Sequence, residues 1–146
     1  LLSHIGAWAP MAEQKAVAQY LLQNDAVDSY LKNFKAALEE RLRKIYNGFM
    51  VLKQKGYAVD AITPQAAIYL TIKIDIAGKK INNKILETQS DVTSYILDEA
   101  KLAVVPFYAF GADRQSPWYR LSIGTCHLEE IDPVFTQLER ALEKLH

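Results

Sequence analysis

The first third of the chain carries apolar residues at intervals of three and four, the spacing that places them along one side of an α-helix. Residues 11–23 show this pattern directly after Pro10, a residue that favours the first turn of a helix. A second pattern follows the capping pair Asn24-Asp25 and stops at Gly56. At about 1.5 Å per residue, this second helix is expected to be roughly 45 Å long.

A helix of that length exceeds what a small domain covers, and we expect it to bridge two bodies. A long periodic pattern is also typical of a coiled coil. Asn47-Gly48 interrupts the apolar stripe, however, and no second helix of that length follows, which favours bridging. The stripe consists of Val27, Tyr30, Leu31, Phe34, Leu38, Leu42, Ile45, Phe49 and Leu52.

The middle of the chain changes to the two-residue period of a β-strand with one buried face. Residues 68–74 alternate most clearly, and residues 58–62 form a weaker strand that ends at Thr63-Pro64. Residues 102–105 form a short apolar strand before Pro106, whereas residues 81–89 are polar and irregular.

The last strand is expected at residues 118–125, where Tyr119, Leu121 and Ile123 face one way and Arg120 lies on the other side. Two further helices are predicted at residues 90–101 and 128–145. The resulting order of helices and strands predicts an α/β fold in which a small mixed sheet is covered by helices.

Composition and charge limit the classes of partner that the chain is expected to bind. Half of the 146 residues are hydrophobic, and seventeen basic side chains balance seventeen acidic ones, so long-range attraction to nucleic acid or an anionic membrane is absent. No apolar run reaches the roughly 18–20 residues that span a bilayer. The single Cys126 needs no oxidising compartment. Because Leu1 is neither an initiator methionine nor part of a basic leader, we expect a piece of a longer chain.

Familiar catalytic patterns are absent from the sequence. The three histidines share no ligand spacing with one another or with Cys126, so no metal site is expected. Cys126 and His127 are neighbours whose side chains point in opposite directions at a strand end, which argues against a nucleophile and its base. The lysines at positions 79, 80 and 84 are expected to form a solvated edge, and no glycine-rich phosphate loop occurs.

Arg120 is the charged residue that most needs an explanation, because it lies in the middle of a strand whose pattern is otherwise typical of a buried segment. It either pairs with an acid of its own fold, extends its guanidinium to solvent, or binds a ligand. A guanidinium binds a carboxylate through two parallel, charge-assisted hydrogen bonds. A carboxylate clamp is therefore the functional alternative.

Several short motifs bear on this choice, and together they resemble the C-terminal third of class I/II aminotransferases of the aspartate aminotransferase type. The motifs are Pro64-Gln65-Ala66-Ala67-Ile68-Tyr69-Leu70, Leu102-Ala103-Val104-Val105-Pro106 with Phe110-Gly111, Trp118-Tyr119-Arg120-Leu121-Ser122-Ile123-Gly124, and the opening Ser3 to Pro10. Their order and the helices between them also agree with that family. The resemblance covers nearly the whole chain.

The resemblance implies a role for each part of the chain. Residues 1–24 would end the large domain that binds pyridoxal phosphate (PLP), and residues 25–146 would form the small C-terminal domain with the long linking helix. Arg120 occupies the place of the arginine that grips the substrate α-carboxylate. His4 and Trp8 are candidate substrate-pocket residues near a dimer interface, with packing in that interface as the alternative. The expected assembly and location are a homodimer and the cytoplasm.

Two departures from the family affect the expected chemistry. Phe107 stands where the family commonly has glycine, so the loop near the substrate is expected to differ in shape. Transamination also needs a lysine that forms a Schiff base with PLP, and no lysine here stands in the matching context, so this chain alone should be inactive. A PLP lyase or decarboxylase-like enzyme on the same fold and a non-catalytic interaction module remain alternatives.

Overall fold

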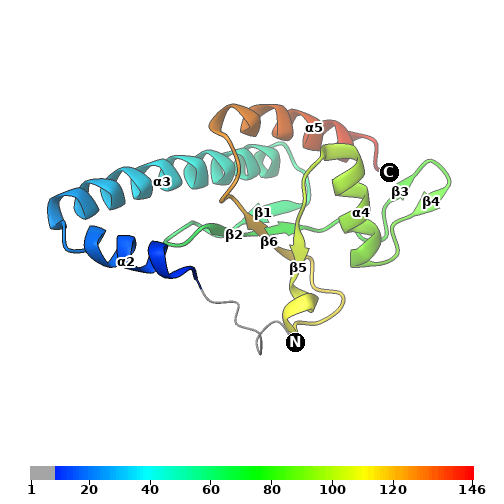
Figure 1. The fold of residues 1–146 in the computed structure, drawn as a ribbon. Helices are drawn as coiled ribbons and strands as arrows, with labels where there is room; N and C mark the ends of the chain where they lie inside the picture. The colour runs from blue at the N-terminus through cyan, green and yellow to red at the C-terminus, as the bar shows by residue number, and fades with distance from the viewer. Residues whose placement is uncertain (1–8) are drawn as a thin grey trace, which may run out of the picture. The chain divides into compact units, whose positions relative to one another are not determined.

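The computed structural model describes residues 9–146, which divide into two compact units on either side of the boundary between Ala37 and Leu38. The expected residues His4 and Trp8 lie outside the described residues. The long helix α3 (Asn24–Gln54) passes through that boundary (Figure 1). Its 31 residues confirm the length expected from the apolar stripe.

The described part of the first unit is helical. Helix α2 (Met11–Tyr20) follows Pro10, as predicted, and the start of α3 completes the unit. No residue of α2 is buried, and its apolar side chains are exposed. Within this unit, the rings of Tyr30 and Phe34 stack with their centroids 5.9 Å apart on successive turns of α3.

The second unit is built on a four-stranded sheet of order β1-β2-β6-β5. The strands are β1 (Val59–Ala61), β2 (Tyr69–Ile74), β5 (Val105–Pro106) and β6 (Trp118–Ser122). Each pairing in this sheet is antiparallel, so the expectation of a mixed sheet was wrong. Residues 62–68 and 107–117 connect neighbouring strands without a helical crossover of the kind that parallel strands need.

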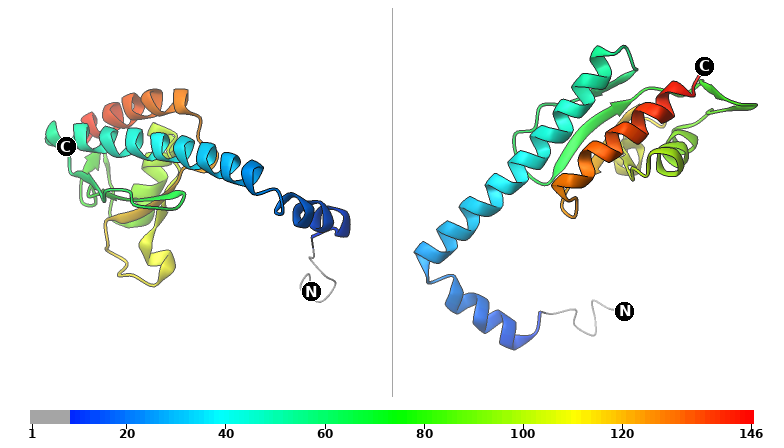
Figure 2. Two further views of the ribbon diagram at one scale, coloured as in Figure 1. Left: turned by 90° about the vertical axis from the view of Figure 1, so that its left-hand side faces the viewer. Right: turned by 90° about the horizontal axis from the view of Figure 1, so that it is seen from above.

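Helices cover one face of this sheet (Figures 1 and 2). They are the second half of α3, α4 (Gln89–Ala100) and α5 (Ile131–Glu143). The buried side chains alternate along the strands as predicted: Leu70, Ile72 and Ile74 on β2 and Tyr119 and Leu121 on β6 lie in the core with the helices. This confirms the α/β class and the helix-covered sheet, and it leaves the opposite face of the sheet free of these helices.

Two short features differ from the expectation. Residues 81–89 were expected to be irregular, yet Lys80–Ile81 (β3) and Lys84–Ile85 (β4) pair as a small antiparallel hairpin. Strand β5 includes Pro106, which lies in an edge strand where a missing N–H is tolerated. Short 3₁₀ helices occur at Phe107–Phe110 (η1) and Leu128–Glu130 (η2). Among the helices described, none has a stretch long and apolar enough to cross a membrane.

Candidate functional site

Arg120 lies at the centre of the sheet face that the helices leave free. Strand β6 runs between β2 and β5, and in the register of the sheet Arg120 pairs with Thr71 on one side and Val105 on the other. Its neighbours Tyr119 and Leu121 are buried on the helix-covered face, so alternation directs Arg120 to the opposite face. The strand periodicity therefore places a half-buried guanidinium on an open surface.

Two aromatic rings flank this guanidinium. The Arg120 Cζ atom lies 4.5 Å from the centroid of the Tyr69 ring and 4.4 Å from that of the Phe110 ring. Both distances are within the range of cation–π attraction. Tyr69 comes from β2 and Phe110 from η1, the turn that follows β5, so the rings approach from elements on opposite sides of β6.

The acid that would neutralise Arg120 inside its own fold is not found among residues 9–146. The ion pairs between described residues involve other basic groups, and no hydrogen bond from the Arg120 guanidinium to a described residue occurs. A guanidinium carries five N–H donors in a planar fork. Since none of the described residues accepts a hydrogen bond from these donors, they are available to a carboxylate.

A buried hydrogen-bonded pair lies on the other face of the same strand. The Tyr119 hydroxyl donates to Oε1 of Gln89, and Nε2 of Gln89 donates to the carbonyl of Gln115 at 3.1 Å. Burial raises the pKa of the Tyr119 hydroxyl well above its ordinary value, so Tyr119 keeps its proton. The pair ties the start of α4 and the loop before β6 to the strand that carries Arg120.

Phe107 is placed by η1 next to the site. Its ring meets the Phe110 ring edge-on, with centroids 6.3 Å apart and planes inclined by 69°. The non-glycine residues with positive φ in the described chain are Ala67, Asn82 and Lys101, and Phe107 is not among them. A side chain is thus accommodated at position 107 without backbone strain.

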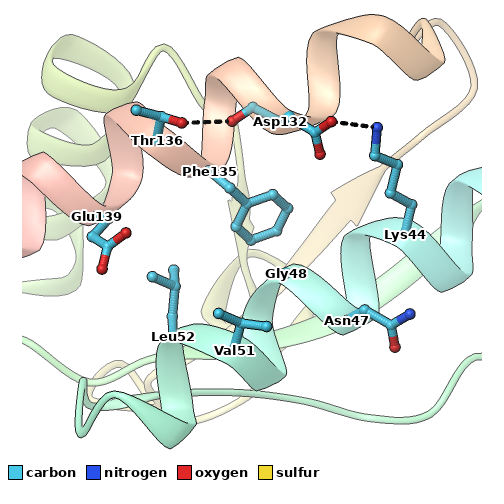
Figure 3. Close-up of a pocket in the computed structure, with 9 residues that line it drawn as sticks. All are labelled: Lys44, Asn47, Gly48, Val51, Leu52, Asp132, Phe135, Thr136 and Glu139. Carbon is cyan, nitrogen blue, oxygen red and sulfur yellow. Dashed lines mark hydrogen bonds and ion pairs between the residues drawn. The ribbon is translucent and has the colours of Figure 1, made fainter.

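A groove of about 320 Å³ lies between α3 and α5 (Figure 3), and Arg120 is not among the residues that line it. Lys44 closes one end of it with an ion pair to Asp132 at 2.8 Å. The Lys44 amine also donates to the carbonyl of Leu128 at 3.2 Å. The Lys44 ammonium group that lines the groove is therefore already neutralised by Asp132.

A smaller apolar cavity of about 180 Å³ is lined in part by Cys126. Burial raises the pKa of the Cys126 thiol, which disfavours the reactive thiolate. The Cys126 thiol contacts the backbone carbonyl of His127, and the backbone N–H of His127 donates to Glu130 as part of the η2 cap. In both contacts His127 takes part through its backbone, and neither joins the thiol to the imidazole.

PLP needs a lysine amine that bonds with it and groups that hold its phosphate, so the surroundings of the described lysines bear on cofactor binding. Six of them are engaged in ion pairs: Lys44, Lys53, Lys55, Lys73, Lys84 and Lys144. The others are exposed, including Lys79 and Lys80 at the β3–β4 hairpin, which was expected to be a solvated edge. Residues 9–146 also bring no three metal-binding side chains together.

Comparisons of the sequence with a family model and with known proteins agree with one another. The family model for aminotransferase class I and II matches residues 5–138. The chain is 38% identical over 93 residues to a probable aspartate/prephenate aminotransferase of Rickettsia felis, covering 62% of this chain and 22% of that protein. It is 26% identical over 118 residues to an aspartate aminotransferase of Rhizobium meliloti, covering 80% and 25%.

Comparison of the fold with solved structures leads to the same group of proteins. The crystal structure of the aspartate aminotransferase from Rhizobium meliloti superposes with a TM-score of 0.66 and 27% sequence identity, over 80% of this chain and 28% of that one. The chain thus spans about a quarter of the length of the relatives that it matches.

Proposed function

Since the chain belongs to the class I and II aminotransferases, we propose that it forms the small domain of a PLP-dependent enzyme that transfers an amino group between an amino acid and a 2-oxo acid. Residues 1–24 end the large domain in this proposal, and residues 25–146 form the small domain with the linking helix. The whole enzyme is a homodimer of the cytoplasm.

Arg120 binds the α-carboxylate of the substrate in this enzyme. The observation that carries the proposal is a guanidinium at the centre of an open sheet face, held between two rings and without an acid partner in residues 9–146. A carboxylate in the guanidinium plane accepts two parallel hydrogen bonds and neutralises the charge. The bound substrate is thereby fixed at one end, and this positioning contributes to the rate.

No lysine here stands in the sequence context of the family's Schiff-base lysine, so in this proposal the cofactor and the proton transfers belong to other parts of the whole enzyme. His4 and Trp8 complete the substrate pocket in this proposal. The 146-residue chain by itself is inactive, and after mixing with PLP and dialysis it should retain no cofactor absorbance band. A stable imine band would contradict the assignment of the lysine to another part of the enzyme.

The test is the Arg120→Lys variant of the full-length enzyme, assayed first with aspartate as the amino donor because the relatives are named for aspartate, together with a 2-oxo acid acceptor. A lysine ammonium cannot reproduce the two-bond fork, so KM for the amino acid should rise at least about tenfold. Arg43→Lys is the matched control, since Arg43 is an exposed arginine paired with Glu39 on α3. Unchanged kinetics for Arg120→Lys would refute the clamp.

The same assay separates transamination from the lyase alternative. A transaminase converts the amino acid to its 2-oxo acid and aminates the acceptor in equal amounts, whereas a lyase or decarboxylase releases a fragment of the substrate. Product analysis with isotopically labelled amino acid distinguishes these reactions. Equal yields of the two transamination products are the expected result.

A further inference from the structure

The support of Arg120 by aromatic rings has a consequence for substrate binding. A basic side chain on a sheet face is usually held by an acid, which fixes its position and also occupies its donors. Tyr69 and Phe110 contact the guanidinium instead, with ring centroids 4.5 and 4.4 Å from Cζ, and a neutral ring does not cancel the positive charge. The side chain is restrained while its edge donors and its net charge remain available to a ligand.

The two rings restrict different motions. Tyr69 extends from β2, two positions from the Thr71 that pairs with Arg120 in the register, so its ring lies diagonally across the face. Phe110 reaches over from η1, beyond the other neighbour of β6. With one ring contributed from each side, the guanidinium cannot swing toward either neighbouring strand without losing a contact.

Phe107 fixes the more exposed of the two rings. The Phe110 side chain is 53% exposed and that of Tyr69 is 43% exposed, so neither is held by the core. The Phe107 ring packs edge-on against Phe110 at a centroid distance of 6.3 Å, an arrangement that favours one orientation of the pair. The three aromatic residues and Arg120 therefore form one contiguous cluster on the open face.

We infer that Tyr69 and Phe110 are positioning residues that orient the Arg120 guanidinium for the substrate carboxylate, and that Phe107 braces Phe110 in that position. This inference rests on the proposed function of Arg120. The rings contribute no hydrogen bond to the substrate carboxylate. They preorganise its binding group, so the loss of a ring should weaken carboxylate binding and leave the later chemical steps largely unchanged.

The test uses the full-length enzyme with Phe110→Leu and Tyr69→Leu, each compared with the aromatic replacements Phe110→Tyr and Tyr69→Phe. Each leucine variant should raise KM for the amino acid roughly threefold to thirtyfold with kcat changed less than about twofold. The aromatic replacements should retain the wild-type KM, because they keep the ring face. Phe107→Gly should raise KM by a smaller factor, about threefold.

A second measurement tests whether the rings act on the carboxylate. Propanoate carries this group without an amino group, and its inhibition constant should rise in parallel with KM in the leucine variants. Arg120→Lys is measured alongside. If Arg120→Lys impairs binding and the leucine variants do not, the positioning inference is wrong and the clamp stands. If Arg120→Lys leaves KM and the inhibition constant unchanged, both are wrong.

The exposed positions of both rings make the leucine variants tolerable to the fold, and thermal unfolding of each variant verifies this. Equal increases in KM for the leucine and the aromatic replacements would overturn the inference, since a ring would then not be the feature that matters. A fall in kcat at unchanged KM would overturn it as well.

Discussion

The ring of Phe135 on α5 lies directly over Gly48 on α3, so that a methyl group at position 48 would come within 2.5 Å of the ring atoms (Figure 3). The same ring meets Phe49 edge-on at 5.2 Å, and Phe49 is fully buried. Glycine at this point allows the two helices to approach closely. The glycine that interrupts the apolar stripe in the sequence is thus a helix-packing residue.

Gly48→Ala should destabilise the protein despite the better helix propensity of alanine. The propensity gain is about 1 kcal/mol, whereas overpacking against a ring held by Phe49 costs about 1–3 kcal/mol. Urea unfolding should therefore show that the free energy of unfolding falls by up to about 2 kcal/mol. Asn47→Ala, at the exposed neighbouring position, is the control and should lose no stability. In a Phe135→Ala background the Gly48→Ala change should become neutral or stabilising; a persisting loss would exclude the ring as its cause.

The Tyr119–Gln89 pair predicts a second stability effect. In Tyr119→Phe the buried Oε1 of Gln89 loses its donor, and an unsatisfied buried acceptor costs about 1–3 kcal/mol. Tyr30→Phe, which removes an exposed hydroxyl, should be neutral. Thermal or urea unfolding measures both changes. The double variant Tyr119→Phe/Gln89→Leu should lose less than the sum of the single changes, and strict additivity would contradict a direct bond between the two residues.

The sequence predicts most of the fold because its helices and long strands are amphipathic. An amphipathic element can be recognised from the spacing of apolar residues along the chain. Residues 118–122 alternate as expected, and α5 follows its apolar stripe. The β3–β4 hairpin was missed because Lys80–Ile81 and Lys84–Ile85 are too short to show a period. Such strands are defined by their pairing, which single-residue patterns do not contain.

The candidate site was predictable only in part. Arg120 is conspicuous in the sequence because a charge mid-strand is unusual, yet its ring partners are set by the strand register and by the η1 turn. Neither is specified by local spacing. Gln89 was missed for a related reason: a polar residue at a helix start is ordinary, and only the tertiary contact with Tyr119 makes it a buried one.

The cap of α4 predicts a pH effect on stability. The Thr88 hydroxyl and backbone N–H both donate to the Asp91 carboxylate, at 2.8 and 2.9 Å, and they lower the pKa of Asp91 below its ordinary value of 3.8. A carboxyl with a lowered folded-state pKa stabilises the protein above its unfolded-state pKa. That contribution disappears as the pH falls through the folded-state value.

Asp91→Asn should therefore destabilise the protein at pH 7, and its effect should shrink as the pH falls through the lowered folded-state pKa of Asp91 and the wild-type carboxylate becomes protonated. Urea unfolding at several pH values measures the difference between the two proteins. Thr88→Ser keeps both donors and serves as the control, with a pH profile like that of the wild type. A constant difference between Asp91→Asn and wild type across the acid range would contradict the assignment.

Ala67 offers the opposite kind of prediction, a substitution by glycine that stabilises. Its φ of 66° lies in the left-handed region, where a side chain costs an L-residue roughly 1–2 kcal/mol. Glycine removes that strain and adds roughly 0.5–1 kcal/mol of unfolded-chain entropy, so Ala67→Gly should stabilise the protein by about 0.5–1 kcal/mol. Ala66→Gly is the matched control: Ala66 itself has no positive φ, so this change brings only the entropy penalty and should destabilise the protein. Equal shifts of the two unfolding midpoints in the same direction would show that position 67 is not strained.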